Sequence, residues 1–193
     1  RARADLYIPA DYVFSERARE ENLTSEALKV AWWKIVLGVK PGLDVEVNSI
    51  DELLEKKIRF VICEPLAGAG KKTKKVLQDP RVDKWEAIQK TEPVSFPTVT
   101  EAALAVKDGG GIQAGFMWNS TAAQNGLQII ELEELEKSRA DITVAVTSTS
   151  RQPALALQFA RYLAAPEKGG EVFARHKYNV IAVDLPGHGR SEG

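Results

Sequence analysis

The sequence predicts an α/β protein with mixed, mostly parallel sheets. Short apolar runs typical of strands alternate with amphipathic helix patterns almost throughout the chain. A length of 193 residues, 44% of them hydrophobic, is sufficient to bury a core in one domain or in two small lobes. The apolar run at residues 28–39 exceeds the usual strand length of about 5–6 residues. Such a run can pass from one lobe into another.

The expected elements follow from these two patterns in order. We expect strands at residues 4–9, 59–63, 113–118, 127–132, 143–147 and 178–183. We expect helices at residues 11–20, 49–55, 71–78, 82–89, 99–107, 153–164 and 167–176. Ser49 and Glu52 form a capping-box pattern at the start of one helix, and Pro153 takes the favoured first position of another.

Large apolar side chains repeat at helical spacing within residues 153–164. They are Leu155, Phe159, Tyr162 and Leu163. Because positions i, i+4, i+7 and i+8 share one helical face, we expect this face to pack in the core.

The composition excludes several classes of protein. Lys and Arg together number 26 against 27 Asp and Glu, a net charge of −1, and no block of one sign is long enough to bind nucleic acid. Cys63 is the only cysteine, so we expect a buried thiol and neither a disulfide nor a cysteine-based metal site. No apolar stretch reaches the about 18 residues that span a bilayer. No signal peptide is present, and we interpret the start at Arg1 as a cut inside a larger protein, which leaves the compartment open.

Residues 67–73, Ala-Gly-Ala-Gly-Lys-Lys-Thr, lie between an expected strand and an expected helix. At such a place free backbone N–H groups and the helix dipole converge on an anion. A nucleotide P-loop would need Gly in place of Pro65 and Ser or Thr in place of Lys72. We therefore interpret the loop as an anion-binding helix N-terminus, with a plain tight turn as the alternative. The helix lysines are expected to be solvated, since desolvating an ammonium group is costly.

Five short segments carry a resemblance to a known family. They are residues 4–11, Glu64-Pro65 with Ala69-Gly70, Pro97-Thr98-Val99-Thr100, residues 114–122 (Ala-Gly-Phe-Met-Trp-Asn-Ser-Thr-Ala), and the pair 160–163 and 173–176. In this order they resemble the molybdate-binding proteins of ABC importers and their tungstate-type relatives. The resemblance covers residues 4–177.

This resemblance implies a fold like that of the type II periplasmic binding proteins, with two lobes of which the first is incomplete. Residues 36–142 would form a complete ligand-binding lobe, and residues 1–35 and 143–180 an incomplete second lobe, because the family's first strand and helix, with two Ser-bearing loops, would precede Arg1. The implied ligand-binding residues are Ala69, Gly70, Val99, Trp118 and Asn119. Ala69 and Val99 would offer backbone N–H groups and Trp118 its indole N–H. A core aromatic at a strand end is the alternative for Trp118.

The implied function is that of the solute-binding component of an ABC importer. The protein would bind a tetrahedral oxyanion, molybdate or tungstate, by hinge closure and catalyse nothing. Its partners would be this small oxyanion and the membrane permease, and it would be a periplasmic or extracytoplasmic monomer without cofactor, metal or catalytic residue. Because half of the ligand shell would precede Arg1, we expect weak or no oxyanion binding by this chain. Two other functions stay open: part of an α/β-hydrolase fusion, or an oxyanion-sensing regulatory domain.

The C-terminal residues resemble a different family. Residues 179–191, Asn-Val-Ile-Ala-Val-Asp-Leu-Pro-Gly-His-Gly-Arg-Ser, are similar to a strand-and-loop segment of α/β-hydrolases. Catalysis in that fold needs a Gly-x-Ser-x-Gly elbow with a downstream acid and His, which this sequence does not offer. We assign residues 181–193 to a hydrolase-like tail, from a genuine fusion or a chimeric reading frame. Residues 178–183 are expected to pair with the sheet of the incomplete lobe.

Overall fold

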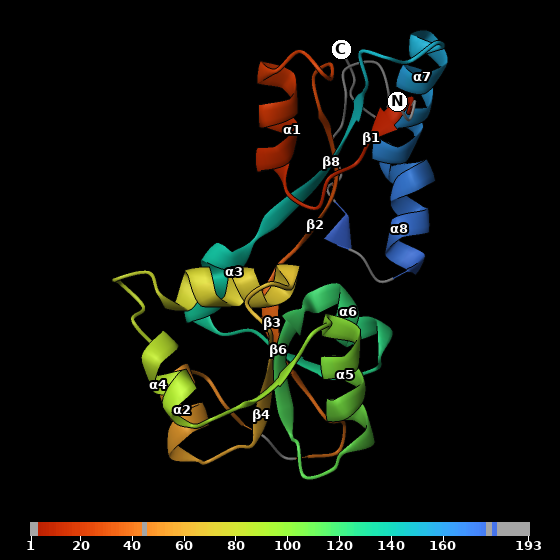
Figure 1. The fold of residues 1–193 in the computed structure, drawn as a ribbon. Helices are drawn as coiled ribbons and strands as arrows, with labels where there is room; N and C mark the ends of the chain where they lie inside the picture. Colours follow the sequence, from red (N-terminus) through yellow and green to blue (C-terminus); the bar gives the residue numbers. More distant parts are fainter. Residues whose placement is uncertain (1–3, 44–45, 177–178, 181–193) are drawn as a thin grey trace, which may run out of the picture. The chain divides into compact units, whose positions relative to one another are not determined.

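The computed structural model describes residues 4–43, 46–176 and 179–180, which divide into two compact units (Figure 1). The described residues up to Trp33 and from Ala140 onward form unit 1, and Lys34–Arg139 form unit 2. The sequence placed the limits of the second of these units at residues 36 and 142. The apolar run 28–39 is interrupted at Lys34, the residue with which the chain enters unit 2.

Unit 2 contains one five-stranded sheet. Its strands are β3 (Ile35–Val39), β4 (Phe60–Cys63), β5 (Val94–Phe96), β6 (Ala114–Trp118) and β7 (Gln128–Ile130). They lie in the order β5-β4-β6-β3-β7, with β4 parallel to β5 and β6, and with β3 antiparallel to β6 and β7. β3, β4 and β6 are almost entirely buried, which accounts for their continuous apolar sequences.

Helices lie on both sides of this sheet. They are α2 (Ile50–Glu55), α3 (Gly68–Leu77), α4 (Trp85–Lys90), α5 (Val99–Asp108), α6 (Asn119–Gln124) and the 3-10 helix η1 (Glu133–Ser138). In Figure 1, α2 and α4 lie to the left of the strands, and α5 and α6 to the right. The sequence did not predict β5, α6 or η1, which have three to six residues and, unlike the equally short α2 with its capping box at Ser49, no local pattern that marks their start.

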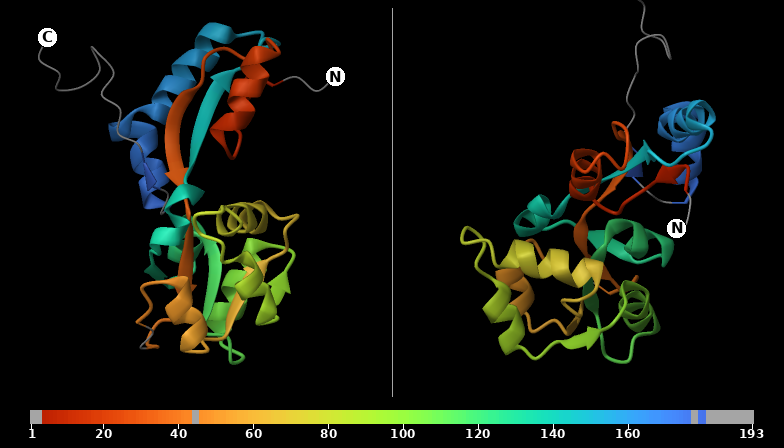
Figure 2. Two further views of the ribbon diagram at one scale, coloured as in Figure 1. Left: turned by 90° about the vertical axis from the view of Figure 1, so that its left-hand side faces the viewer. Right: turned by 45° about the horizontal axis from the view of Figure 1, so that its top comes forward.

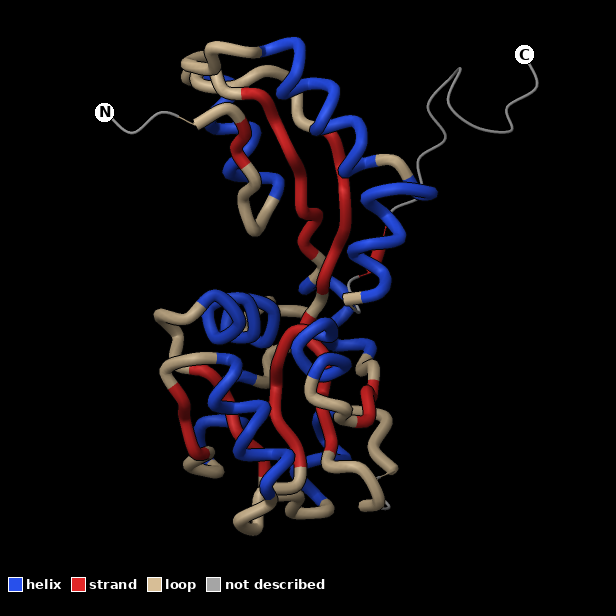
Figure 3. The backbone as a smooth tube through the Cα atoms, turned by 90° about the vertical axis from the view of Figure 1, so that its right-hand side faces the viewer, coloured by secondary structure: helices blue, strands red, loops and turns tan. Residues whose placement is uncertain are grey.

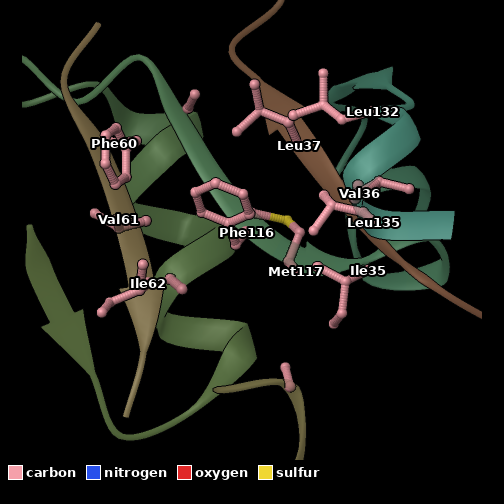
Figure 4. Packing of buried hydrophobic residues seen from close by; sticks show 14 of the residues in the cluster. Ile35, Val36, Leu37, Phe60, Val61, Ile62, Phe116, Met117, Leu132 and Leu135 are labelled. Atoms are coloured by element: carbon pink, nitrogen blue, oxygen red, sulfur yellow. The ribbon is translucent and has the colours of Figure 1, made fainter. Parts of the chain in front are cut away.

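The larger hydrophobic core lies in unit 2 (Figure 4). Side chains from β3, β4, β6 and η1 meet there, among them Leu37, Phe116 and Leu135. Phe60 and Phe116 pack edge to face with ring centroids 5.6 Å apart. Cys63 is 1% exposed in this core, as predicted, and burial raises the pKa of its thiol to about 11.

Unit 1 is built on β1 (Leu6–Tyr7), β2 (Leu28–Trp33), β8 (Ala140–Val146) and β9 (Asn179–Val180). The strand order is β1-β8-β2-β9, and these described strands pair antiparallel. Figure 3 shows the long strands β2 and β8 side by side. Figures 1 and 2 show α1 (Tyr12–Glu20) and α7 (Pro153–Ala164) on opposite sides of this sheet. A π-helical turn, Pro166–Gly170, connects α7 to α8 (Glu171–Arg175).

The prediction that Leu155, Phe159 and Tyr162 pack in the core is wrong. These side chains are 57%, 51% and 44% exposed, and the rings of Phe159 and Tyr162 stack on one another with centroids 6.2 Å apart. Leu163 does pack against the core of unit 1. The face that α7 turns to the sheet consists of alanines, Ala156, Ala160 and Ala164. Alanines let the helix lie close to the strands, and helical spacing alone does not show which face is inside.

The α/β class with mixed sheets is confirmed, but the expectation that the sheets are mostly parallel is wrong: among the described strands only β4 with β5 and β4 with β6 pair in parallel, and the other pairs are antiparallel. α3 begins at Gly68, three residues before the predicted start at residue 71. β9 pairs with β2, as expected for the apolar run 178–183. The hydrolase-like tail, residues 181–193, lies outside the described residues.

Candidate functional site

Three helices of unit 2 begin at one edge of its sheet. α3 follows β4, α5 follows β5 and α6 follows β6, and these three strands are parallel. Their carboxyl ends therefore lie at the same edge, which we call the carboxyl edge. In open α/β sheets this is where ligands bind. All five residues predicted to bind the ligand lie in these strand-to-helix connections or at their ends.

The start of α3 presents backbone N–H groups without a capping side chain. The N-cap residue is Ala67, which has no side-chain oxygen. The Lys71 N–H donates to the Ala67 carbonyl over 2.8 Å. The N–H groups of Gly68, Ala69 and Gly70 precede this bond, so they have no acceptor within the helix. Three donors and the positive end of a ten-residue helix dipole thus lie at the carboxyl edge.

Gly70 allows α3 to begin close to the end of β4. A Cβ atom at this position would lie 2.0 Å from the carbonyl oxygen of Glu64 and 2.4 Å from that of Cys63. At Gly68 a Cβ atom would meet nothing within 4 Å. The structure therefore gives Gly70 a packing function, and its contact with a ligand stays a prediction.

α5 begins with a capping box that uses part of its N-terminal donors. The Thr98 hydroxyl accepts a hydrogen bond from the Glu101 N–H, and the Glu101 carboxylate accepts one from the Thr98 N–H, each over 3.2 Å. The N–H groups of Val99 and Thr100, which lie between them, have no acceptor within the helix. The resemblance assigns the backbone N–H of Val99 to the ligand, and this N–H has no acceptor within the helix. The Glu101 carboxylate, however, places a negative charge beside this N–H.

Trp118 ends β6 and Asn119 begins α6. The Trp118 side chain is half-buried and packs against the core of unit 2, as expected if it is a core aromatic at a strand end. Asn119 is 6% exposed, and its Oδ1 accepts hydrogen bonds from the N–H groups of Lys34 (3.2 Å) and Ser120 (2.9 Å). This oxygen therefore binds backbone groups, and a ligand contact by either residue stays a prediction.

Two further buried polar residues of unit 2 were not predicted from the sequence. Ser138 is 0% exposed and Lys34 is 7% exposed. The Ser138 hydroxyl accepts a hydrogen bond from the Ile35 N–H over 2.8 Å. The one available signal was a lysine in the middle of the apolar run 28–39, whereas nothing in the sequence marks Ser138.

The lysines of α3 are arranged as expected for a solvated face. Lys71 and Lys75 are exposed, and the Lys74 ammonium group lies 5.8 Å from the centre of the Trp85 ring. Across residues 4–43, 46–176 and 179–180, no group of three or more His, Cys, Asp or Glu side chains is placed to hold a metal ion. In the same part of the chain, the helices are all too short or too polar to cross a membrane.

A hollow of about 320 Å³ lies at the opposite edge of the sheet, around the amino end of β4. Its lining is mostly apolar and includes Leu53, Ile58, Phe60, Pro93 and Ile112. No residue predicted to bind the ligand contributes to it. Lys57, Arg59 and Glu92 also line this hollow, whereas the uncapped backbone donors suited to an anion lie at the carboxyl edge.

Comparisons with known proteins support the fold. A family model described as "Bacterial extracellular solute-binding protein" matches residues 1–178, a match that gives the hydrolase-like tail no support. A comparison with curated proteins gives no match. The chain is similar to the substrate binding domain of a putative molybdenum ABC transporter from Clostridium difficile, with 22% identity and a TM-score of 0.75 over 93% of this chain and 78% of that one.

Two further solved structures are similar. The periplasmic molybdate-binding protein of Azotobacter vinelandii is 20% identical with a TM-score of 0.64, over 93% of this chain and 80% of that one. Iron-bound HitA from Pseudomonas aeruginosa is 14% identical with a TM-score of 0.73, over 100% of this chain and 74% of that one. These similarities confirm the predicted fold.

Proposed function

The chain belongs to the family of bacterial extracellular solute-binding proteins, and on this premise we propose that it binds a tetrahedral oxyanion of the molybdate and tungstate class at the carboxyl edge of unit 2. Proteins of this family bind solutes rather than catalyse reactions, so we assign no catalytic residue. The ligand class and its contacts are the substance of the proposal.

The observation that carries the proposal is the uncapped start of α3. A fully ionised oxyanion only accepts hydrogen bonds, and the N–H groups of Gly68, Ala69 and Gly70 only donate them. Hydrogen bonds to an ionised acceptor are roughly twice as strong as neutral ones, and the helix dipole adds about 0.3–1 kcal/mol. The small side chains of this turn let an anion approach the backbone closely. These donors carry no charge of their own, which suits a receptor that must release its ligand again.

The choice of anion draws on the similar structures. Two of them are described as molybdenum or molybdate proteins, which supports molybdate and tungstate as ligands. A third is described as iron-bound and another as a ferric binding protein, so ferric ion is the competing ligand to be tested. We further infer that the protein serves an ABC importer, delivers its ligand to the membrane permease in the periplasm or another extracytoplasmic space, and acts as a monomer without a cofactor.

Amide chemical shifts recorded during a titration with molybdate test the proposal. We expect saturable shifts at the first-turn amides of α3, residues 68–70, and smaller ones at Val99 and Thr100, where the Glu101 carboxylate opposes the anion. Tungstate should act as molybdate does. Binding is expected to be weak, which this measurement tolerates.

The start of α2 provides a control within the same spectrum. There the Ile50 N–H donates to the Glu134 carboxylate over 3.0 Å, and the Glu52 N–H donates to the Ser49 hydroxyl over 3.1 Å. These satisfied amides should not respond to the anion. Equal responses at α2 and α3 would mean a general ionic effect, and a response to ferric ion in place of molybdate would replace the proposed ligand.

A further inference from the structure

Asn119 makes the transition from β6 to α6 without loss of a sheet hydrogen bond. Ile35 pairs with Trp118, so Lys34 lies opposite Asn119 in the antiparallel ladder. Two residues paired in this way normally exchange both backbone hydrogen bonds. Here the Asn119 N–H donates to the Lys34 carbonyl over 2.9 Å, while the Lys34 N–H donates to Asn119 Oδ1 over 3.2 Å. The side-chain oxygen replaces the backbone carbonyl of Asn119, which is left for the first turn of α6.

Ser138 makes a similar contact one residue further along β3. Its buried hydroxyl accepts a hydrogen bond from the Ile35 N–H and donates one to the Leu135 carbonyl in η1. Lys34 is the first residue of unit 2 and Arg139 is the last. The segment with which the chain enters unit 2 is therefore bonded to the segment with which it leaves.

The Lys34 ammonium group joins the same two segments by ion pairs. It lies 2.6 Å from the Glu136 carboxylate and 2.9 Å from the Glu131 carboxylate. Burial by itself would lower the pKa of Lys34, but the hydrogen bonds to Glu136 and Glu131, together with the negative charges of these carboxylates, outweigh burial and raise it. A largely buried ammonium group without partners would be costly, so the strand and η1 depend on one another for their positions.

We propose that five residues, here named the clasp, position the start of α6 for ligand binding; they are Lys34, Asn119, Ser138, Glu131 and Glu136. The inference rests on the proposed function, because Trp118, the residue before α6, is one of the predicted ligand contacts. The clasp acts through Trp118, because the Asn119 oxygen that belongs to it accepts hydrogen bonds from backbone N–H groups. It also ties α6 to both segments at which the chain passes between the units. Loss of the clasp therefore loosens this part of the carboxyl edge and leaves the donors of α3 in place.

Hydrogen exchange of the Lys34 amide tests the clasp without any ligand. Asn119→Leu preserves the size of the side chain but removes the acceptor, so we expect exchange at Lys34 to become about 10- to 100-fold faster. Asn119→Asp retains an acceptor oxygen and should restore most of the protection. Ser138→Ala gives a second test, through faster exchange at the Ile35 amide, should Asn119→Leu fail to fold. Unchanged exchange at these amides would overturn the clasp.

A molybdate titration of the same variants tests the positioning function. We expect the dissociation constant of Asn119→Leu to rise roughly 3- to 30-fold, and that of Ser138→Ala, which removes the other buried acceptor of the clasp at a residue not predicted to bind the ligand, to rise as well. The Trp118 indole N–H should lose its response to molybdate while the α3 amides keep theirs, a difference that general destabilisation would not produce. An unchanged dissociation constant and Trp118 response, despite faster Lys34 exchange, would overturn the positioning function. A wild-type chain whose α3 amides ignore molybdate would refute the proposed function, and the exchange measurement would still decide the clasp.

Discussion

Replacing Gly70 by alanine adds a single carbon atom, the Cβ, to the start of α3. The added Cβ would lie 2.0 Å from the Glu64 carbonyl oxygen and 2.4 Å from the Cys63 carbonyl oxygen. Close carbon–oxygen contacts in proteins lie at about 3.3–3.6 Å, so the first turn of α3 must move by roughly 1 Å. Overpacking of this kind costs about 1–3 kcal/mol, and the upper part of the range is expected because both obstacles are backbone atoms.

Gly68→Ala is the matched control, since it makes the same change two residues earlier in the same helix. Its Cβ meets nothing within 4 Å, so the gain from replacing a helical glycine, about 0.5–1 kcal/mol, should be retained. The free energies of unfolding of the two variants are therefore expected to differ by about 1.5–4 kcal/mol.

Cys63 makes the assay specific to unit 2, because it is the only cysteine and is 1% exposed in the core of that unit. Thiol labelling across a urea series measures the unfolded fraction of unit 2. The midpoint of Gly70→Ala should fall below that of the wild type, and the midpoint of Gly68→Ala should equal or exceed it. Equal midpoints for the two variants would refute the view that α3 begins against the end of β4.

Three further predictions concern other parts of the chain. Because burial raises the pKa of Cys63 to about 11, its thiol should resist labelling in the folded protein, and ready labelling at neutral pH would contradict its burial. Because the pKa of Lys34 is raised in the folded protein, the stabilisation from its ion pairs is complete below 10.5, the pKa of the unfolded lysine, and is lost as the pH rises through the pKa of the folded protein. The difference in urea midpoint between the wild type and Lys34→Met should therefore shrink as the pH rises through this range. A constant difference would count against the ion pairs. Phe159→Ser should cost at most about 1 kcal/mol and Ala160→Leu about 1–3 kcal/mol, and the reverse order in thermal unfolding would mean that α7 presents its other face to the sheet.

The start of α3 could be predicted from the sequence because its determinants are local. A strand, a turn of small residues and a helix follow one another within residues 60–77, and the anion site expected there needs only backbone groups. The start of the helix was placed three residues late, since the small residues that suggest a loop also allow a helix to begin close to a strand. Gly70 is such a residue.

The hydrogen bond between Asn119 and Lys34 could not be predicted, because the two residues lie 85 positions apart in the sequence. Which residue supplies a missing ladder acceptor depends on strand pairing, and no local pattern encodes this pairing. The outer face of α7 was misassigned for a related reason. Periodicity predicts that Phe159 and Tyr162 share a face of α7, but it does not show whether that face packs against β2 and β8. The face that packs there consists of small alanines, which let the helix lie close to the strands.

The affinity of molybdate for Ala67→Asp tests the central claim most directly. The carboxylate of an aspartate at this N-cap would accept a hydrogen bond from the N–H group of Ala69 or Gly70 and would place a negative charge where the anion is proposed to bind. Such a cap stabilises a helix by about 0.5–2 kcal/mol, so a loss of binding could not be attributed to unfolding. We predict that the saturable amide shifts of the wild type disappear in this variant while its urea midpoint rises. Molybdate binding to Ala67→Asp as tight as to the wild type would contradict the assignment of the oxyanion to the start of α3.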